Sequence, residues 1–195
     1  SDPGADTVTQ YVVHWGDGAT STYVSPGNVT HVYADGPNSY MIAVDLVDED
    51  GTHADAGSLS VTVDNAVPTI TLSGPATVTE GATYTLNLGP VTDPGADTVT
   101  QYVVHWGDGA TSTYASPGDV SHVYTDGPNG YTITVDLVDE DGTHTDAGSL
   151  SLMVDNAVPT ITLSGPASVT EGAAYTLILG TVTDPGADTV TQYVV

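Results

Sequence analysis

The chain has 195 residues and carries 25 Asp and Glu, six His and no Lys, Arg or Cys, for a formal net charge of −25. Phosphate recognition and binding to anionic membrane surfaces both depend on Lys and Arg, so the composition excludes nucleic acids and membrane surfaces as main partners. No run of about 20 apolar residues occurs, so no membrane insertion is expected. At neutral pH the negative charge of every carboxylate must be stabilised by water, by backbone N–H groups or by a bound cation.

The sequence is a tandem repeat. DPGADTVTQYVV begins at Asp2, Asp93 and Asp184, which gives a period of 91 residues. With AVPTITLSG as the start of a unit, 1–65 is a partial repeat without its first two strands, 66–156 is complete, and 157–195 holds only the first strands. Partial sandwiches expose sheet edges and apolar faces, so we expect completion by neighbouring identical repeats, in the same chain or head to tail between chains.

The complete repeat contains short segments of β-branched and aromatic residues, broken by Gly, Pro, Asn and Asp, and none with helical periodicity. The predicted strands are 69–73, 84–88, 99–106, 111–114, 120–124, 131–138 and 149–155. On the third of these, alternation places Tyr102, Val104 and Trp106 on one face, which we assign to the core. The pattern predicts an all-β protein of tandem, seven-stranded, immunoglobulin-like β-sandwich repeats.

Three motifs follow one another in the complete repeat: WGDG at 106–109, HVY at 122–124 and VDLVDEDG at 135–142. In this order they resemble the polycystic-kidney-disease (PKD) repeat, and the resemblance covers essentially the whole period. One departure is that Val104 and Trp106 stand where the family usually has Trp and Phe. The resemblance implies an extracellular, immunoglobulin-like module of bacterial or archaeal adhesin-like surface proteins, usually without catalytic activity. No HExxH, nucleophile elbow or phosphate loop is present in the sequence, so we expect no enzyme.

Acidic loops are the candidate metal sites. In immunoglobulin-like sandwiches the second-to-third and sixth-to-seventh strand loops meet where the chain enters the domain, and both are acidic here, as DPGAD and DEDG. Calcium accepts six to eight oxygens and needs no thiolate, so we predict bound Ca²⁺ between repeats, in an arrangement that resembles cadherin junctions. The predicted ligands are Asp64, Asn65, Asp93, Asp97, Asp139 and Asp141 at one junction, and Glu80, Asp108, Asp155, Asn156, Asp184 and Asp188 at the next.

The interpretation is a structural repeat of an extracellular stalk, adhesin or filament, stiffened by calcium. Three alternatives stay open. The acidic loops can be solvated turns or a salt-adapted surface. The module can bind a surface glycan or protein through outward tyrosines, for which Tyr114, Tyr124 and Tyr131 are candidates. The chain can also be the subunit of a head-to-tail polymer completed by neighbouring chains. His105 is expected at the surface without a partner, and Asn28 begins a glycosylation sequon.

Overall fold

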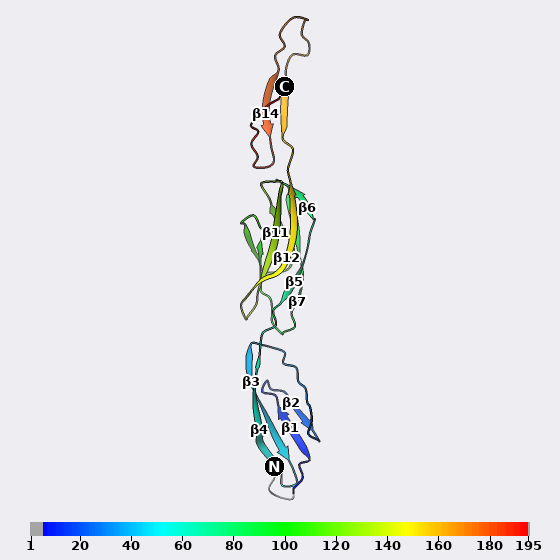
Figure 1. Cartoon of the computed structure of the whole chain (residues 1–195), viewed down its shortest axis with the longest axis vertical. Helices are drawn as coiled ribbons and strands as arrows, with labels where there is room; N and C mark the ends of the chain where they lie inside the picture. Colours follow the sequence, from blue (N-terminus) through cyan, green and yellow to red (C-terminus); the bar gives the residue numbers. More distant parts are fainter. Residues whose placement is uncertain (1–5, 195) are drawn as a thin grey trace. The chain divides into compact units, whose positions relative to one another are not determined.

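The computed structural model describes residues 6–194, and none of these lies in a helix (Figure 1). The chain forms two compact units, Ser1–Pro68 with Asp93–Thr98 and Thr69–Thr92 with Val99–Val195, which are described separately. The fold class expected from the sequence is confirmed as an all-β, immunoglobulin-like architecture. The division into repeats at residues 65 and 156 stays a prediction from the period.

The first unit contains one antiparallel sheet with the strand order β2-β1-β3-β4. Its strands are β1 (Gln10–His14), β2 (Thr20–Tyr23), β3 (Asn38–Val47) and β4 (Thr52–Val63). A β-bulge interrupts the β3–β4 pairing between Val44 and Leu46.

The second unit holds the complete repeat, built from two sheets with the orders β10-β7-β5 and β6-β12-β11-β8-β9. Its strands are β5 (Thr69–Ser73), β6 (Thr77–Thr79), β7 (Thr83–Thr92), β8 (Gln101–His105), β9 (Thr111–Tyr114), β10 (Gly118–Val123), β11 (Asn129–Val138) and β12 (Thr143–Asp155). A hairpin of β13 (Thr160–Ser164) and β14 (Ile178–Thr183) follows. The seven predicted strands are all present, and the structure adds the three-residue β6, which pairs in parallel with β12.

The core of the complete repeat lies between its two sheets. Tyr102, Val104 and Trp106 are 5%, 0% and 0% exposed, which confirms the face assigned from alternation. Further buried side chains come from both sheets: Tyr84, Leu86 and Leu88 of β7 in the opposite sheet, and Ile133, Val135 and Leu137 of β11 with Leu152 and Val154 of β12 in the same sheet as β8. Alternate residues of each strand thus form one continuous apolar layer.

Strands form only where a partner strand is present. β10 pairs with β7 in the complete repeat, but its copy at 27–32, within the described residues, forms no strand. The copy of β6 at 168–170 and that of β8 at 192–194, both described, likewise form none. These segments are nearly identical in sequence to β10, β6 and β8, and what they lack is the neighbouring strand. Pairing in this chain is therefore set by tertiary context more than by local propensity.

The WGDG turn needs glycine for its backbone. Gly107 and Gly109 have φ angles of 88° and 96°, and a Cβ on Gly107 would lie 2.7 Å from the carbonyl oxygen of Thr132. Asp108 Oδ1 accepts the N–H of Ala110 at 2.9 Å and closes the turn. The turn carries the chain from β8 to β9 with Trp106 directed into the core.

Two core tyrosines differ in whether the buried hydroxyl has a hydrogen-bond partner, and this difference can be tested. Tyr124 donates to the carbonyl oxygen of Trp106 at 2.9 Å, whereas the buried Tyr84 hydroxyl has no partner among the described residues. We expect Tyr124→Phe to lower the free energy of unfolding by about 1–3 kcal/mol, because it orphans a buried carbonyl. Tyr84→Phe should leave it unchanged or slightly raised. Denaturant unfolding of both variants measures the difference, and equal losses would contradict this account of the core.

Candidate functional site

Glu80 is a buried carboxylate at the end of the complete repeat. It follows β6, is 1% exposed, and its N–H donates to the carbonyl oxygen of Asp155 at 2.9 Å. Oε1 accepts the N–H of Ala157 at 2.8 Å and Oε2 accepts that of Gly127 at 2.5 Å. A buried carboxylate is costly unless it is hydrogen-bonded, and these backbone donors stabilise it. Glu80 thereby ties the segment leaving β12 to the loop before β11.

The DPGAD loop of the following repeat lies directly against Glu80. Ligand oxygens of Glu80, Asp184 and Asp188 all lie within 4.8 Å of one another. A Cβ on Gly186 would lie 2.5 Å from Glu80 Oε1, so only glycine fits at this approach. Ala187 donates its N–H to the carbonyl oxygen of Thr125 at 2.7 Å, which fixes the loop on the preceding repeat. The structure thus brings three of the predicted ligands together.

The carboxylates of this cluster are not fully balanced by hydrogen-bond donors. Asp184 Oδ2 is buried and has no hydrogen-bond partner among the described residues. The pKa of Asp188 is raised, first by desolvation and then by the charges of Glu80, Asp184 and Asp126. Because like charges at this spacing repel, the cluster is electrostatically incomplete as a set of side chains alone.

Asn156 lies between two of these carboxylates. Its amide is 2.8 Å from Glu80 Oε1 and 2.6 Å from Asp188 Oδ2. With its nitrogen toward them, Asn156 donates to both oxygens. Asn156 therefore bridges Glu80 and Asp188 as a hydrogen-bond donor.

The first unit repeats part of this arrangement. Asp93 Oδ1 accepts the N–H of Gly95 at 3.0 Å, and Ala96 donates its N–H to the carbonyl oxygen of Ala34 at 2.9 Å. The latter bond is the copy, 91 residues earlier, of the one between Ala187 and Thr125. Asp93 Oδ2 and Asn65 Oδ1 are buried without a hydrogen-bond partner among the described residues. Orphaned buried oxygens therefore recur at the same repeat positions.

The remaining predicted ligands have other surroundings. Asp108 contacts His122 Nε2 at 2.6 Å, and Asp139 contacts His144 Nε2 at 2.8 Å. The Asp139 carboxylate also accepts the N–H groups of Asp141 and Gly142 within its own turn. The other members are the half-buried Asp97 in the first unit and the exposed side chains of Asp64, Asp141 and Asp155. At the second predicted junction, the Asp108 carboxylate is thus bound by His122 and by its own turn. Asp155 contributes its carbonyl oxygen, which accepts the N–H of Glu80.

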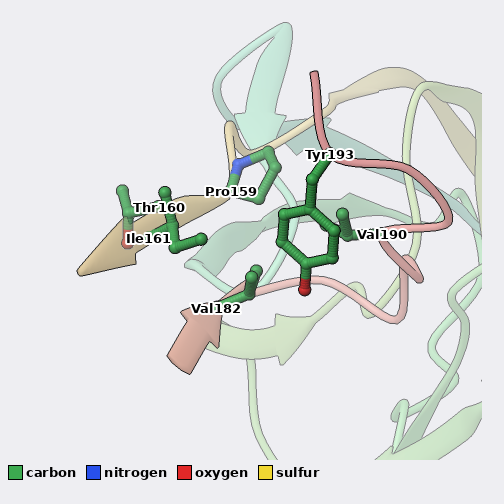
Figure 2. Close-up of a pocket in the computed structure, with 6 residues that line it drawn as sticks. All are labelled: Pro159, Thr160, Ile161, Val182, Val190 and Tyr193. Atoms are coloured by element: carbon green, nitrogen blue, oxygen red, sulfur yellow. The ribbon is translucent and has the colours of Figure 1, made fainter. Parts of the chain in front are cut away.

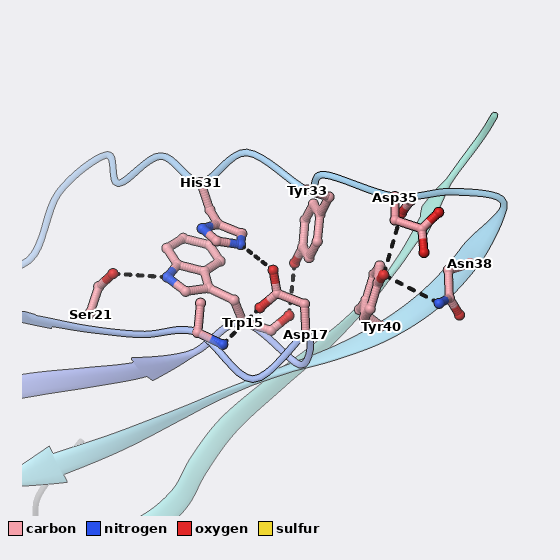
Figure 3. A network of polar contacts seen from close by, with 9 residues as sticks. Trp15, Asp17, Ser21, His31, Tyr33, Asp35, Asn38 and Tyr40 are labelled. Carbon is pink, nitrogen blue, oxygen red and sulfur yellow. Dashed lines mark hydrogen bonds and ion pairs between the residues drawn. The ribbon is translucent and has the colours of Figure 1, made fainter. Parts of the chain in front are cut away.

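All six histidines contact an aspartate at 2.6–2.9 Å, a feature that the sequence analysis missed. His105, expected to have no partner, contacts Asp136 Oδ2 at 2.8 Å across neighbouring strands. In the first unit His31 lies between the stacked ring of Trp15 and the Asp17 carboxylate (Figure 3).

The tyrosines expected to face outward do not form an exposed platform. Tyr124 is 1% exposed and stacks on Tyr131 with ring centroids 4.9 Å apart. Tyr114 is half-buried against the core. Figure 3 shows the matching rings of Tyr33 and Tyr40 in the first unit. Tyr124 therefore belongs to the core, and Tyr114 and Tyr131 are half-buried against it.

Comparison with known proteins decides the family. Residues 65–154 match the PKD domain family. The complete repeat is a PKD domain. PKD domains are generally non-enzymatic modules and are typically extracellular. No helix among residues 6–194 has the length and apolar character to cross a membrane.

A solved structure of the fibronectin(III)-like modules of Clostridium thermocellum CbhA is similar to this chain at 17% identity and a TM-score of 0.39. The match covers 80% of this chain and 82% of that one. No curated protein matches the sequence.

The His–Asp contacts yield a matched pH prediction. The pKa of Asp17 is lowered mainly by the hydrogen bond with His31, whereas that of Asp45 is lowered mainly by the N–H of Asp55 and then by His14. We expect His31→Ala to raise the pKa of Asp17 more than His14→Ala raises that of Asp45.

Carboxyl chemical shifts followed by NMR during an acid titration measure both pKa values. Since the folded-state pKa of Asp17 lies below its ordinary value of 3.8, this contact stabilises the fold above that pH. The contribution is lost as the pH falls through the lower folded-state pKa. Equal changes at both sites would contradict the assignment.

Proposed function

We propose that the chain is a structural repeat of an extracellular stalk, adhesin or filament, in which calcium stiffens the junctions between successive PKD domains. The observation that carries the proposal is the convergence of Glu80, Asp184 and Asp188 from two successive repeats. An ion bound there links repeats that are otherwise joined by a short connection. Tandem identical domains need such links to act as a rod instead of a flexible string.

The donor set fits calcium. The three carboxylates offer only oxygen ligands, which suit Ca²⁺ better than zinc. Calcium–oxygen distances are about 2.3–2.6 Å, so oxygens on opposite sides of one ion lie about 5 Å apart, which agrees with the 4.8 Å limit of the cluster. The orphaned Asp184 Oδ2 gains a partner when an ion binds.

Each of the two repeats supplies part of the proposed ligand set. Glu80 and Asn156 belong to the preceding repeat, with Glu80 held by two backbone N–H groups. Asp184 and Asp188 belong to the following repeat, on a loop that only Gly186 allows to approach. At the other junction Asn65, Asp93 and Asp97 occupy the matching positions, and the DEDG loop with Asp139 and Asp141 is predicted to add ligands.

A competing role is an acidic spacer whose carboxylates serve solubility in salt. Such a spacer responds to ionic strength in general and not to one divalent ion. The calcium proposal requires a response that is specific for calcium and confined to the clustered carboxylates. A single unfolding experiment therefore distinguishes the two roles.

Thermal unfolding of the full chain in EDTA, calcium and magnesium tests the proposal. At calcium concentrations about 100-fold above Kd, binding adds about 2.7 kcal/mol to the folded state, so we expect Tm to rise by several degrees. Magnesium should do less, because it requires a near-ideal octahedral site. Asp184→Asn combined with Asp188→Asn should reduce the calcium-dependent rise, and what remains should come from the other junction.

Asp119→Asn is the matched control, because Asp119 is exposed on β10 outside the cluster and the first unit has Asn28 at the copy position. We expect this variant to keep the calcium response of the unaltered chain. An identical Tm in EDTA, calcium and magnesium would contradict the calcium proposal and favour the salt-adapted spacer.

A further inference from the structure

The small cavity in the β13–β14 hairpin is almost entirely apolar. Figure 2 shows it lined by Pro159, Thr160, Ile161, Val182, Val190 and Tyr193. These lining residues carry no carboxylate, imidazole or side-chain amide. A reactive side chain is found instead at the exposed start of β11.

Strand β11 begins with an asparagine–glycine pair, Asn129–Gly130. Both residues are exposed, and a Cβ on Gly130 would meet only the terminal carbon of Met153, at 3.9 Å. Of the six asparagines in the chain, Asn129 alone precedes a glycine. The pair is thus open to water and free of close packing.

The Asn129 side chain is folded back over the peptide group that follows it. Gly130 donates its N–H to Asn129 Oδ1 at 3.0 Å, so the amide carbon that carries this oxygen lies beside the Gly130 nitrogen. Asn129 Nδ2 donates to the Tyr131 hydroxyl at 3.2 Å. The side-chain amide therefore lies next to the backbone nitrogen with which it can close a succinimide ring.

We propose that Asn129 is a site of spontaneous deamidation through a succinimide. The deprotonated Gly130 nitrogen attacks Asn129 Cγ, and the new C–N bond closes the ring. The bond from Cγ to Nδ2 then breaks, and ammonia leaves with a proton taken from water. Water adds to either carbonyl of the ring and reopens it to aspartate or isoaspartate. The net reaction consumes water and releases ammonia, with no oxidation or reduction.

Glycine at the following position is what makes ring closure accessible. The backbone must leave the extended conformation for the ring to form, and glycine does so at little steric cost because it has no Cβ. Asn129 is also the first residue of β11, opposite Val154, so only the end of the strand has to open.

The first unit contains the same contacts with a different following residue. Asn38 lies 91 residues earlier, its Oδ1 accepts the N–H of Ser39 at 2.9 Å, and its Nδ2 donates to Tyr40 at 3.2 Å (Figure 3). Ser39 stands where the complete repeat has Gly130. Because the serine Cβ restricts the backbone, deamidation at Asn38 should be slower by about 10-fold or more.

Deamidation places a further carboxylate on a chain that has no Lys or Arg. The new group replaces the Nδ2 donor beside the Tyr131 hydroxyl, and isoaspartate also lengthens the backbone at the entry of β11. Two repeats of nearly identical sequence therefore acquire different charge with time. The reaction uses no metal, so it is independent of the calcium proposal.

Peptide mapping of the full chain after incubation at mildly alkaline pH tests the proposal. Because the chain has no Lys or Arg, chymotrypsin, which cleaves after aromatic residues, replaces trypsin. It releases the matched peptides 125–131 and 34–40, which end at Tyr131 and Tyr40. The mass gain from exchange of an NH₂ for an OH group should accumulate about 10-fold faster in 125–131, and a digest made before incubation gives the background.

Exchange of the two following residues gives reciprocal controls. Gly130→Ser should lower the rate at Asn129 to that at Asn38, and Ser39→Gly should raise the rate at Asn38 by about 10-fold. Each variant introduces the residue that the other repeat already carries at this position, so both are compatible with the fold, which the Tm of each variant checks.

Two results would overturn the inference. One is an equal rate at Asn129 and Asn38, which indicates that the following residue does not control the reaction. The other is an unchanged mass at Asn129 in the folded chain over a period in which the urea-unfolded chain deamidates, which indicates that pairing of β11 protects the site. The rates should be the same in EDTA and in calcium, so failure of the calcium proposal leaves this inference intact.

Discussion

The constraint on which this structure depends is the need to balance 25 acidic side chains without a single Lys or Arg. Two kinds of balance are present. Backbone N–H groups hold Glu80 and contribute to Asp45, and histidines hold Asp17, Asp108 and the other paired aspartates. Where successive repeats meet, the carboxylates of Asp184 and Asp188 gather without enough donors. The proposed calcium ion supplies the balance that is missing there.

A second constraint is that half a sandwich does not stabilise its own strands. Residues 27–32 and 118–123 differ only at two positions, yet only the latter form a strand, because only they have β7 beside them. A fully buried Leu contributes about 1.5–3 kcal/mol, and Leu177 and Leu179, which are 40% and 41% exposed, obtain only part of this.

Sequence periodicity predicted the fold well where residues act locally. Alternation placed Trp106 in the core, and the strands at 69–73 and 111–114 have the predicted bounds. It missed β6, which is too short to show a pattern and exists through its pairing with β12. For the site, sequence found the right loops but not the buried role of Glu80, whose donor Ala157 is 77 residues away. Nor did it reveal that His122 engages Asp108, because that contact depends on how β10 packs against the turn between β8 and β9.

Hydrogen exchange at the junction amides tests the central claim most directly, namely that a cation orders the contact between repeats. The N–H of Ala187 bonds to Thr125 across the junction, and that of Val135 lies in the core of the complete repeat and serves as the internal reference. The account predicts that calcium, but not magnesium, slows exchange at Ala187 relative to EDTA while exchange at Val135 changes far less. Identical exchange at Ala187 in EDTA and in calcium would contradict it.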